Sequence, residues 1–297
     1  MTTALQSAIE SGQQVFTAEV MPPRGANPSH MLQMASLLKG RVHAVNVTDG
    51  SRAVMRMSSL ASCRLLLDAG IEPVLQQACR DRNRIGLQAD LLGAHALGIR
   101  NLLCLTGDPV RAGDQTDARP VHELDSIKLL RQVAGLNLGE DPVNGELVDG
   151  ATALYPGCAA DPQCPSWNGL QRRVERKRDA GARFVQTQMV MDPEALDRFQ
   201  AQLAEPLKLP VLAGVFLLKS ARNAQFINRM VPGACIPDRL IERLDQAADP
   251  AMEGISIAAE QVRRYLGIVQ GVHLMAIKAE DRVPKILELA GVSPLPV

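Results

Sequence analysis

Eight short apolar runs recur along this chain, and most of them close on a polar residue beside a glycine or a proline. The polar residues at these positions are Glu19, Thr48, Asp49, Gln76, Asp108, Tyr155 and Gln188. In an α/β barrel the carboxyl ends of all the parallel strands open onto one face, where the βα loops build the active site. Residues that are scattered along the sequence would therefore converge in space, which indicates an enzyme.

The eight runs are predicted to be the strands of one parallel barrel. Most of them are continuously apolar, as expected of parallel strands covered on both faces, and helical periods lie between them. The predicted strands span residues 15–21, 43–48, 72–78, 101–106, 151–155, 184–190, 210–217 and 272–276. A single barrel of this kind typically occupies about 250 residues. The 297-residue chain is therefore predicted to be an α/β protein, a (β/α)8 TIM barrel forming one catalytic domain, residues 1–297.

The ends of several helices can be placed from single residues. Asp192 followed by Pro193 is typical of an N-cap and a first-turn proline. Gly70 and Gly98 each follow a helical apolar pattern and suit the left-handed conformation beyond a helix end. The stripe predicted to be buried before Gly98 consists of Ile85, Ala89, Leu92 and Ala96.

Irregular and extra segments interrupt the alternation of strands and helices. Residues 111–120, 139–150 and 156–167 are rich in turn formers and are predicted to be loops. As insertions on the catalytic face they would bind substrate or cover it, the alternative being solvated loops. Two extra helices are expected before the last strand, over residues 236–247 and 255–266.

The charge balance argues against a polyanionic partner. Lys plus Arg equals Asp plus Glu at 32 each, so the formal net charge is zero and no general attraction to nucleic acid or to a membrane surface is implied. No apolar run approaches the roughly 20 residues that span a bilayer. We expect a cytoplasmic enzyme acting on a small molecule.

The six cysteines lack the paired spacing of a structural zinc site, and no metal is expected. Cys63 and Cys104 lie in apolar runs and are predicted to be small core residues. Cys158 and Cys164 are predicted to be free thiols in a loop, although a disulfide or a metal between them is conceivable.

Glu19 is the strongest candidate for a catalytic acid. It lies between Ala18 and Val20 in an apolar run, and apolar surroundings disfavour the charged form of a carboxyl group. A proton would then be available for general acid catalysis near neutral pH. The alternative is a solvent-facing glutamate on the barrel rim. Asp108 has a similar alternative, because an aspartate before a proline is common in turns.

Several segments of the chain, taken together, resemble the methylenetetrahydrofolate reductase family. They are TAEVMPPR, NVTDG, ACRDRNRIGLQADLLGAHALGIRNLLCLTGDP, ALYPG, KRDAGARFVQTQMVMD and GVHLM, and they follow the order and spacing of the family over almost the whole chain. The resemblance implies a barrel that reduces 5,10-methylenetetrahydrofolate to 5-methyltetrahydrofolate. The electrons would come from NADH or NADPH through a bound flavin, expected to be FAD, with FMN or no tightly bound flavin as the alternatives. Because the chain ends soon after the eighth strand's helix, a catalytic domain alone is expected.

The resemblance also implies roles for particular residues. Glu19 matches the catalytic glutamate that promotes protonation of folate N10, which opens the five-membered ring to a 5-iminium cation. Asp108 matches an aspartate near the flavin and the pterin, and Gln188 matches a glutamine that contacts folate. Thr48 and Lys177 match positions that bind the ribityl and phosphate part of the flavin.

Tyr155 matches an aromatic residue that packs at the cofactor. Each of these matches has a plainer alternative, such as a core tyrosine or a solvated lysine.

The chain departs from the family at positions that contact the flavin. Thr106 stands where an arginine is usual, and Gln76 replaces a histidine. Ala221 stands where a phenylalanine often packs on the substrate. Losing an arginine can remove a strong contact to a phosphate.

The segment CRDRNR offers substitutes for that contact. Arg80, Arg82 and Arg84 would lie on the correct face, Asp81 or Asn83 is expected to have a role there, and a solvated loop is the alternative.

Three hypotheses follow. The first is a flavin-dependent methylenetetrahydrofolate reductase, which we favour. The second is a barrel that handles folate without a flavin, by direct hydride transfer from nicotinamide or as a pterin-dependent methyl-transfer protein. The third is a non-catalytic subunit that scaffolds a partner. A homo-oligomer or a partner redox subunit is compatible with the first.

Overall fold

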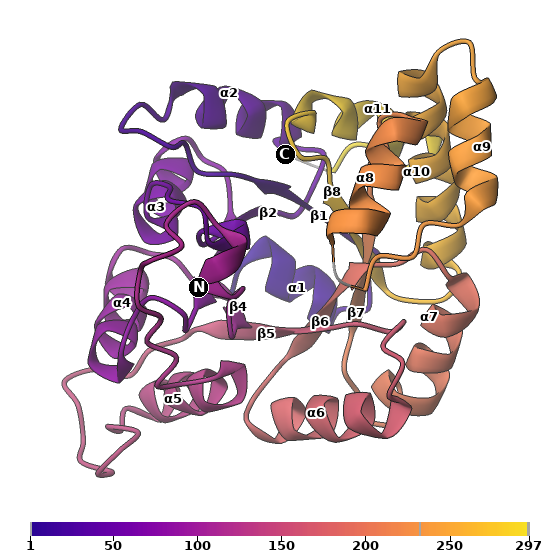
Figure 1. The fold of residues 1–297 in the computed structure, drawn as a ribbon. Helices are drawn as coiled ribbons and strands as arrows, with labels where there is room; N and C mark the ends of the chain where they lie inside the picture. The colour runs from indigo at the N-terminus through magenta and orange to yellow at the C-terminus, as the bar shows by residue number, and fades with distance from the viewer. Residues whose placement is uncertain (1, 232, 296–297) are drawn as a thin grey trace.

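The eight strands close into one parallel barrel in chain order, from β1 round to β8 and back to β1 (Figure 1). The computed structural model describes residues 2–231 and 233–295. The strands are β1 (Val15–Val20), β2 (Ala44–Val47), β3 (Pro73–Ala78), β4 (Asn101–Leu105), β5 (Tyr155–Ala160), β6 (Phe184–Met189), β7 (Val211–Phe216) and β8 (Gly271–Met275). This confirms the predicted (β/α)8 fold.

Helices surround the barrel (Figure 1). They are α1 (Ala4–Glu10), α2 (Ser29–Leu38), α3 (Ser59–Asp68), α4 (Arg84–Ala96), α5 (Ser126–Leu138), α6 (Trp167–Asp179), α7 (Pro193–Phe199), α8 (Ala221–Met230), α9 (Asp238–Gln246), α10 (Pro250–Leu266) and α11 (Val283–Leu289). None of these described helices is long and apolar enough to cross a membrane. Short 3-10 segments are η1 (Ser51–Ala53), η2 (Val110–Ala112) and η4 (Glu280–Arg282), and a π-helical turn, η3 (Gln200–Ala204), extends α7.

The extra helices before the last strand are only partly those predicted. The predicted segments 236–247 and 255–266 correspond to α9 and α10. However, α10 packs against both β7 and β8, as the ordinary crossover helix of a barrel does. The added pair is therefore α8 and α9, which pack on each other. Helix α8 was not predicted, because its buried side is limited to Ala221, Ala224 and Ile227.

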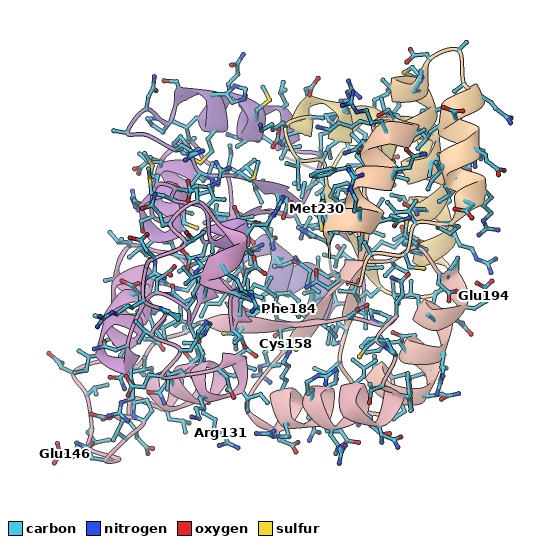
Figure 2. All side chains as sticks on the ribbon, viewed as in Figure 1. Arg131, Glu146, Cys158, Phe184, Glu194 and Met230 are labelled. Atoms are coloured by element: carbon cyan, nitrogen blue, oxygen red, sulfur yellow. The ribbon has the colours of Figure 1, made fainter. Side chains whose placement is uncertain are left out.

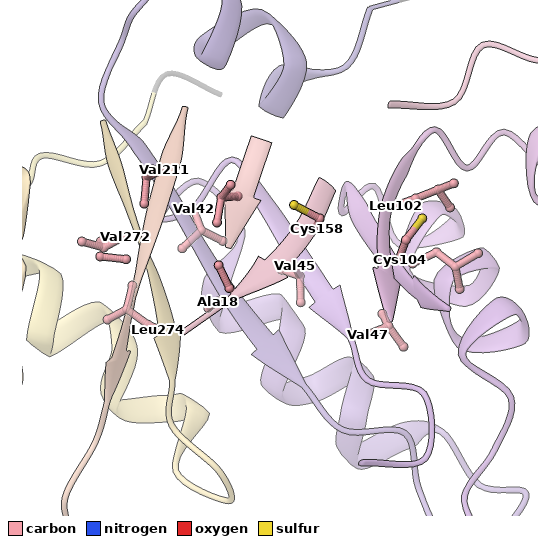
Figure 3. Close-up of a cluster of buried hydrophobic side chains, with 14 of the residues drawn as sticks. Ala18, Val42, Val45, Val47, Leu102, Cys104, Cys158, Val211, Val272 and Leu274 are labelled. Atoms are coloured by element: carbon pink, nitrogen blue, oxygen red, sulfur yellow. The ribbon is translucent and has the colours of Figure 1, made fainter. Parts of the chain in front are cut away.

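Side chains alternate between the two faces of the barrel wall, as the two-residue period of a strand requires. One set points outward into the layer of helices and forms the main core, and Figure 3 shows several of its members on β1, β2, β4, β5, β7 and β8. The other set points inward. Its lowest layer, at the amino-terminal end of the barrel, includes Val15, Ala44, Val74, Tyr155, Phe184 and Leu212.

Helix α1 closes the amino-terminal end of the barrel. Leu5, Ala8 and Ile9 of α1 pack on the lowest inward layer. Thr3 caps the helix, its side chain accepting a hydrogen bond from Gln6 N at 3.0 Å. Burying Leu5 completely stabilises the fold by roughly 2 kcal/mol. The open end of the barrel is therefore the carboxyl-terminal one.

Helix α7 begins and packs as predicted. The Asp192 side chain accepts hydrogen bonds from the backbone N–H groups of Glu194 and Ala195, and Pro193 occupies the first turn. Leu196 and Phe199 are fully buried.

The buried stripe predicted for α4 is wrong. The helix buries Leu87, Leu91 and Ala94, whereas Ile85 is 71% exposed and Leu92 is 41% exposed. Two apolar stripes run along this helix. Only one of them can face the sheet, so the other is left exposed to solvent.

Strand β5 differs from its prediction over residues 151–155. It begins at Tyr155 and continues through Ala160, so Pro156 and Gly157 belong to the strand and not to a turn. Gly157 is required inside the barrel, because a Cβ atom there would lie 2.3 Å from the ring of Phe184. Cys158 is consequently a fully buried strand residue and not a loop thiol, whereas Cys63 and Cys104 are buried as predicted.

The loop over residues 139–150 was predicted on the catalytic face, and this is wrong. It connects α5 to β5 and therefore lies at the amino-terminal side of the barrel. It projects away from the barrel in Figure 1, with Glu146 near its tip in Figure 2. Only the part of 156–167 that follows β5 is a βα loop.

Candidate active site

A cavity of about 540 Å³ opens at the carboxyl-terminal end of the barrel. In a closed parallel barrel the carboxyl ends of all the strands meet at one opening. Residues at the ends of strands β1 to β8 do line this cavity. Seven of the eight residues predicted for the site are among them: Glu19, Thr48, Gln76, Thr106, Asp108, Lys177 and Gln188. The convergence of these positions is thus present in the structure.

Tyr155 is the exception. Because β5 starts at this residue, Tyr155 lies at the opposite end of the barrel, in the layer that α1 covers. Its ring stacks on Phe184 with 5.8 Å between centroids, and burial raises the pKa of its hydroxyl to about 12. The expectation that Tyr155 packs at a cofactor is therefore wrong.

Glu19 points into the barrel at the floor of the cavity. Its side chain is 12% exposed, and its Oε2 lies 3.7 Å from Nε2 of His273 on β8. His273 is completely buried, and its Nδ1 lies 2.9 Å from the hydroxyl of Thr17 on β1. The sequence predicted apolar surroundings for Glu19, but the structure also places the polar ring of His273 beside it. His273 was not among the predicted site residues, although it is the polar residue within the apolar strand GVHLM.

A second polar pair lies in the barrel interior. Asn46 on β2 donates a hydrogen bond through Nδ2 to Oε1 of Gln186 on β6, at 2.8 Å, and both residues are buried. Asn46 is in register with Glu19, and Gln186 lines the cavity. Gln186 thus lines the cavity, and Asn46 holds its side-chain amide in place. The signal that could have found the pair is a polar residue within an apolar run, Asn46 in AVNV and Gln186 in FVQTQM.

Asp108 is positioned by the loop after β2. Its Oδ2 accepts a hydrogen bond from the backbone N–H of Arg52 at 2.7 Å. Gly107 precedes it with φ +95°, and a Cβ atom at Gly107 would lie 2.9 Å from the Cβ of Arg80. A glycine at this position therefore lets the chain turn so that Asp108 faces the cavity.

Asp49 lines the cavity and is held by hydrogen bonds and an ion pair. Its Oδ2 accepts hydrogen bonds from Ala78 N at 2.9 Å and from Arg82 Nη1 at 2.8 Å. Arg82 also forms an ion pair with Asp90 of α4 at 2.8 Å. Burial alone would lower the pKa of the Arg82 guanidinium, but the carboxylates of Asp49 and Asp90 raise it overall. Arg82 thus ties the end of β2 to α4.

The other residues of CRDRNR have separate tasks. Arg80 is 3% exposed, lines the cavity and makes two hydrogen bonds to Asp81, at 2.8 and 2.7 Å. Asn83 caps α4 by accepting a hydrogen bond from Gly86 N. Arg84 lies 3.9 Å from Glu123 at the surface.

Gln188 lies at an irregularity in the sheet. The register of β6 with β7 shifts between Gln186 and Met189, so Gln188 falls at the shift. Thr187 occupies the wall, where its hydroxyl accepts a hydrogen bond from Gly214 N at 2.8 Å. Such irregularities re-aim a side chain next to an active site.

The cavity contains groups suited to the ribityl and phosphate parts of a nucleotide cofactor. The hydroxyl of Thr48 is buried and has no partner in the described structure. Lys177 on α6 donates through Nζ to the carbonyl of Ala159 at 2.7 Å, and Arg173, one turn earlier, lines the same cavity. Unlike the Thr48 hydroxyl, the Thr106 hydroxyl has a partner, because it accepts a hydrogen bond from Ser126 N at the start of α5. Among the described residues no group of three or more His, Cys, Asp or Glu side chains is placed to hold a metal ion.

Comparison with solved structures bears on the fold. An F420-dependent secondary alcohol dehydrogenase superposes with a TM-score of 0.56 at 11% identity, covering 94% of this chain and 99% of that one. A tryptophan synthase from M. tuberculosis superposes with a TM-score of 0.50 at 13% identity, covering 99% of this chain and 100% of that one. At these identities the likeness shows a shared barrel and nothing about the reaction.

Comparison of sequences identifies the family. A probable methylenetetrahydrofolate reductase (NADPH) of Caenorhabditis elegans is 26% identical over 97% of this chain and 44% of its own length. Methylenetetrahydrofolate reductase 2 of Schizosaccharomyces pombe is 24% identical over 74% of this chain and 36% of its own length. This chain thus spans less than half the length of these relatives. The sequence model of the family described as methylenetetrahydrofolate reductase matches residues 4–291. The chain therefore belongs to the methylenetetrahydrofolate reductase family.

Proposed function

We propose that this chain reduces 5,10-methylenetetrahydrofolate to 5-methyltetrahydrofolate, with a hydride that originates from NADH or NADPH. Family membership supports the reaction class. The observation that carries the proposal is the position of Glu19, a mostly enclosed carboxyl group at the floor of a cavity that Asp108 and Gln188 also line. General acid catalysis requires a carboxyl group within reach of the atom that is protonated.

Glu19 is the proton donor in this proposal. In the substrate a methylene carbon bridges folate N5 and N10. When Glu19 delivers its proton to N10, the bond between N10 and the methylene carbon breaks and leaves a 5-iminium cation. Addition of hydride to that carbon gives the methyl group on N5. Glu19 is left as a carboxylate and takes up a proton again before the next cycle.

Asp108 and Gln188 complete the folate side. The negative charge of Asp108 would stabilise the cationic folate, because opposite charges attract strongly in a cavity that excludes bulk water. Arg52 N holds the carboxylate in place without neutralising it, since a backbone N–H carries no net charge. The amide of Gln188 can both donate and accept hydrogen bonds, which suits the edge of a pterin ring.

The residues on the other side of the cavity fit a flavin. Thr48, Gln76 and Lys177 would hold it through a hydroxyl, an amide and an ammonium group. The bound flavin would supply a carrier that takes hydride from the nicotinamide nucleotide and passes it to folate. The unpartnered Thr48 hydroxyl is the structural feature that best supports such a ligand. FAD is the form that the family resemblance suggests.

Direct hydride transfer from the nicotinamide to folate is the second candidate. The side of the cavity formed by β3 and β4 favours it, because the Thr106 hydroxyl is engaged by Ser126 and the Arg80 guanidinium is engaged by Asp81. Both side chains thus already have partners within the protein. The same folate-side residues would serve either route.

The test is the absorbance spectrum of the freshly purified protein, followed by anaerobic addition of NADH or NADPH and then of methylenetetrahydrofolate. Bleaching of a flavin band by the nucleotide and its return with folate would support the flavin route. A colourless protein that oxidises the nucleotide only when folate is present would support direct transfer. Failure to oxidise either nucleotide in the presence of folate, with or without added FAD, would overturn the proposed reaction.

A further inference from the structure

We propose that Thr17 and His273 are positioning residues for Glu19, which together hold the Nε2–H tautomer of the imidazole toward the Glu19 carboxyl group. The geometry is independent of any assigned activity, whereas its catalytic consequence rests on the proposed function. Thr17 and Glu19 lie two residues apart on β1, so both side chains point into the barrel. His273 on β8 is in register with Thr17.

The burial of His273 requires a reason. Its ring is completely buried in the barrel interior, and Nε2 has no hydrogen-bond partner in the described structure. An unsatisfied buried polar atom costs about 1–3 kcal/mol, and native structures contain few of them. Nε2 lies 3.7 Å from Glu19 Oε2, and Gly214 on the neighbouring strand β7 contributes no side chain. Glu19 is therefore the charged group that this nitrogen faces.

The partner of Nδ1 determines which tautomer is present. Thr17 Oγ1 lies 2.9 Å from Nδ1, and a hydroxyl can donate to an unprotonated nitrogen. When Thr17 donates, the single proton of the neutral imidazole is on Nε2 and points at Glu19. The opposite arrangement would present an unprotonated Nε2, which could not donate a hydrogen bond to the carboxylate that Glu19 becomes once its proton has left. A hydrogen bond at one ring nitrogen fixes the state of the other in the same way at many histidine sites.

The separation of 3.7 Å has a consequence for catalysis. It is longer than a hydrogen bond, so Nε2 of His273 and the Glu19 carboxyl group are not bonded to each other in the structure. Once Glu19 has given its proton to folate, the new carboxylate can draw the N–H inward and form a charge-assisted hydrogen bond. His273 would thus stabilise the charge that develops on Glu19, and Thr17 would keep the ring ready to do so.

The first experiment reads the tautomer directly by nitrogen-15 NMR of the histidine rings in the wild-type protein without substrate. The chain has five histidines, and His273→Gln assigns the signals. We expect a protonated Nε2 and an unprotonated Nδ1 on His273. A protonated Nδ1 with an unprotonated Nε2 would overturn the proposal. This measurement needs no catalytic activity, so it remains valid if the proposed reaction is wrong.

The second experiment tests the consequence with Thr17→Val, which keeps the shape but removes the hydroxyl, and Thr17→Ser, which restores it. We expect Thr17→Val to lose the tautomer preference and to reduce kcat for folate about 10- to 100-fold, the cost of a small misplacement of a catalytic group. Thr17→Ser should recover most of both.

The matched control for this experiment is Thr152→Val. It removes a buried threonine hydroxyl that bonds Asn137 outside the cavity, and it should leave the NMR signals of His273 unchanged. Equal losses in Thr17→Val and Thr17→Ser, or a wild-type rate and tautomer in Thr17→Val, would overturn the positioning role.

Discussion

The side chain of Asn46 on β2 spans the barrel interior to reach Gln186 on β6, and the two amides meet at 2.8 Å. The two residues are 140 positions apart in the chain, and both are buried, although Gln186 lines the cavity. Barrel interiors are usually filled with layers of branched apolar side chains. Here an amide pair lies beside Glu19, so the cavity floor is polar and its shape depends on a single hydrogen bond.

We expect Gln186→Met to lower the free energy of unfolding by about 1–3 kcal/mol, because it leaves the buried Asn46 amide without its partner. Asn46→Leu should behave similarly. The double variant should lose less than the sum of the two, with a coupling of about 1 kcal/mol. Urea unfolding of the four proteins measures this cycle, and strictly additive losses would show that the hydrogen bond contributes nothing.

Two helical glycines should respond oppositely to alanine. A Cβ atom at Gly254 in α10 would lie 1.8 Å from the carbonyl oxygen of Leu218, whereas nothing lies within 4 Å of one at Gly93 in α4. We expect Gly254→Ala to destabilise the protein by about 3 kcal/mol through overpacking against backbone. Gly93→Ala should stabilise it by about 0.5–1 kcal/mol through the lower entropy of the unfolded chain. Thermal unfolding of both variants checks the contrast, which would fail if the two shifts had the same sign.

Stability should decrease on the acid side of neutrality because of His43. Burial lowers the pKa of this imidazole from 6.5, and its Nδ1 accepts a hydrogen bond from Phe16 N at 3.1 Å. As the pH falls, the unfolded chain binds a proton before the folded one, so unfolding becomes easier as the pH drops below about 6.5. Urea midpoints between about pH 7.5 and about pH 5 should decline more steeply for the wild type than for His43→Gln. Parallel curves would contradict the assignment.

Thiol reagents should distinguish the cysteines. Cys235 is exposed and Cys164 is half-buried, whereas four thiols are buried: Cys63, Cys79, Cys104 and Cys158. Burial raises the pKa of Cys158 to about 11 and that of Cys79 to about 12, which removes the reactive thiolate. Mass spectrometry after brief alkylation should find label on Cys235 first and then on Cys164, with the buried four labelled only in urea. Early labelling of Cys158 would mean that β5 is not a wall strand.

Glu19→Gln tests the proposed acid. The amide is almost the same size but has no proton to give, so the rate of folate reduction should fall about 10²- to 10⁴-fold. Binding of folate, followed by isothermal calorimetry, should change little. If a flavin is present, its reduction by the nicotinamide nucleotide should be nearly unaffected. Glu123→Gln at the surface serves as the control, and an equal loss in both half-reactions would make Glu19 structural.

The sequence predicts the barrel well because each strand is covered on both faces. A strand such as β7, with Val211, Leu212, Ala213 and Val215 all buried, has to be apolar throughout, and that makes it visible as a run. The prediction for β5 is wrong because Pro156 and Gly157 follow the rules for turns. Gly157 packs against the Phe184 ring of strand β6, and this contact cannot be read from the sequence around residue 157.

The sequence predicts individual residues of the site but not the contacts between them. The end of each run identifies Glu19, Asp108 and Gln188 as polar positions on the catalytic face, and the structure brings them to one cavity. Their partners are not predictable, because Thr17 and His273 are 256 positions apart in sequence. Whether Thr106 faces a ligand or the start of α5 is likewise decided by a distant residue, Ser126.

Under the proposed function, the closure of one barrel end by α1 determines how the two reactants reach the site. With Leu5, Ala8 and Ile9 packed on the lowest layer, the described structure gives nucleotide and folate a shared route of entry through the carboxyl-terminal opening. Reactants that share one route exclude each other when one of them fills it. For the proposed reaction we therefore expect high concentrations of folate to slow turnover by competing with the nucleotide, because α1 seals the other end of the barrel.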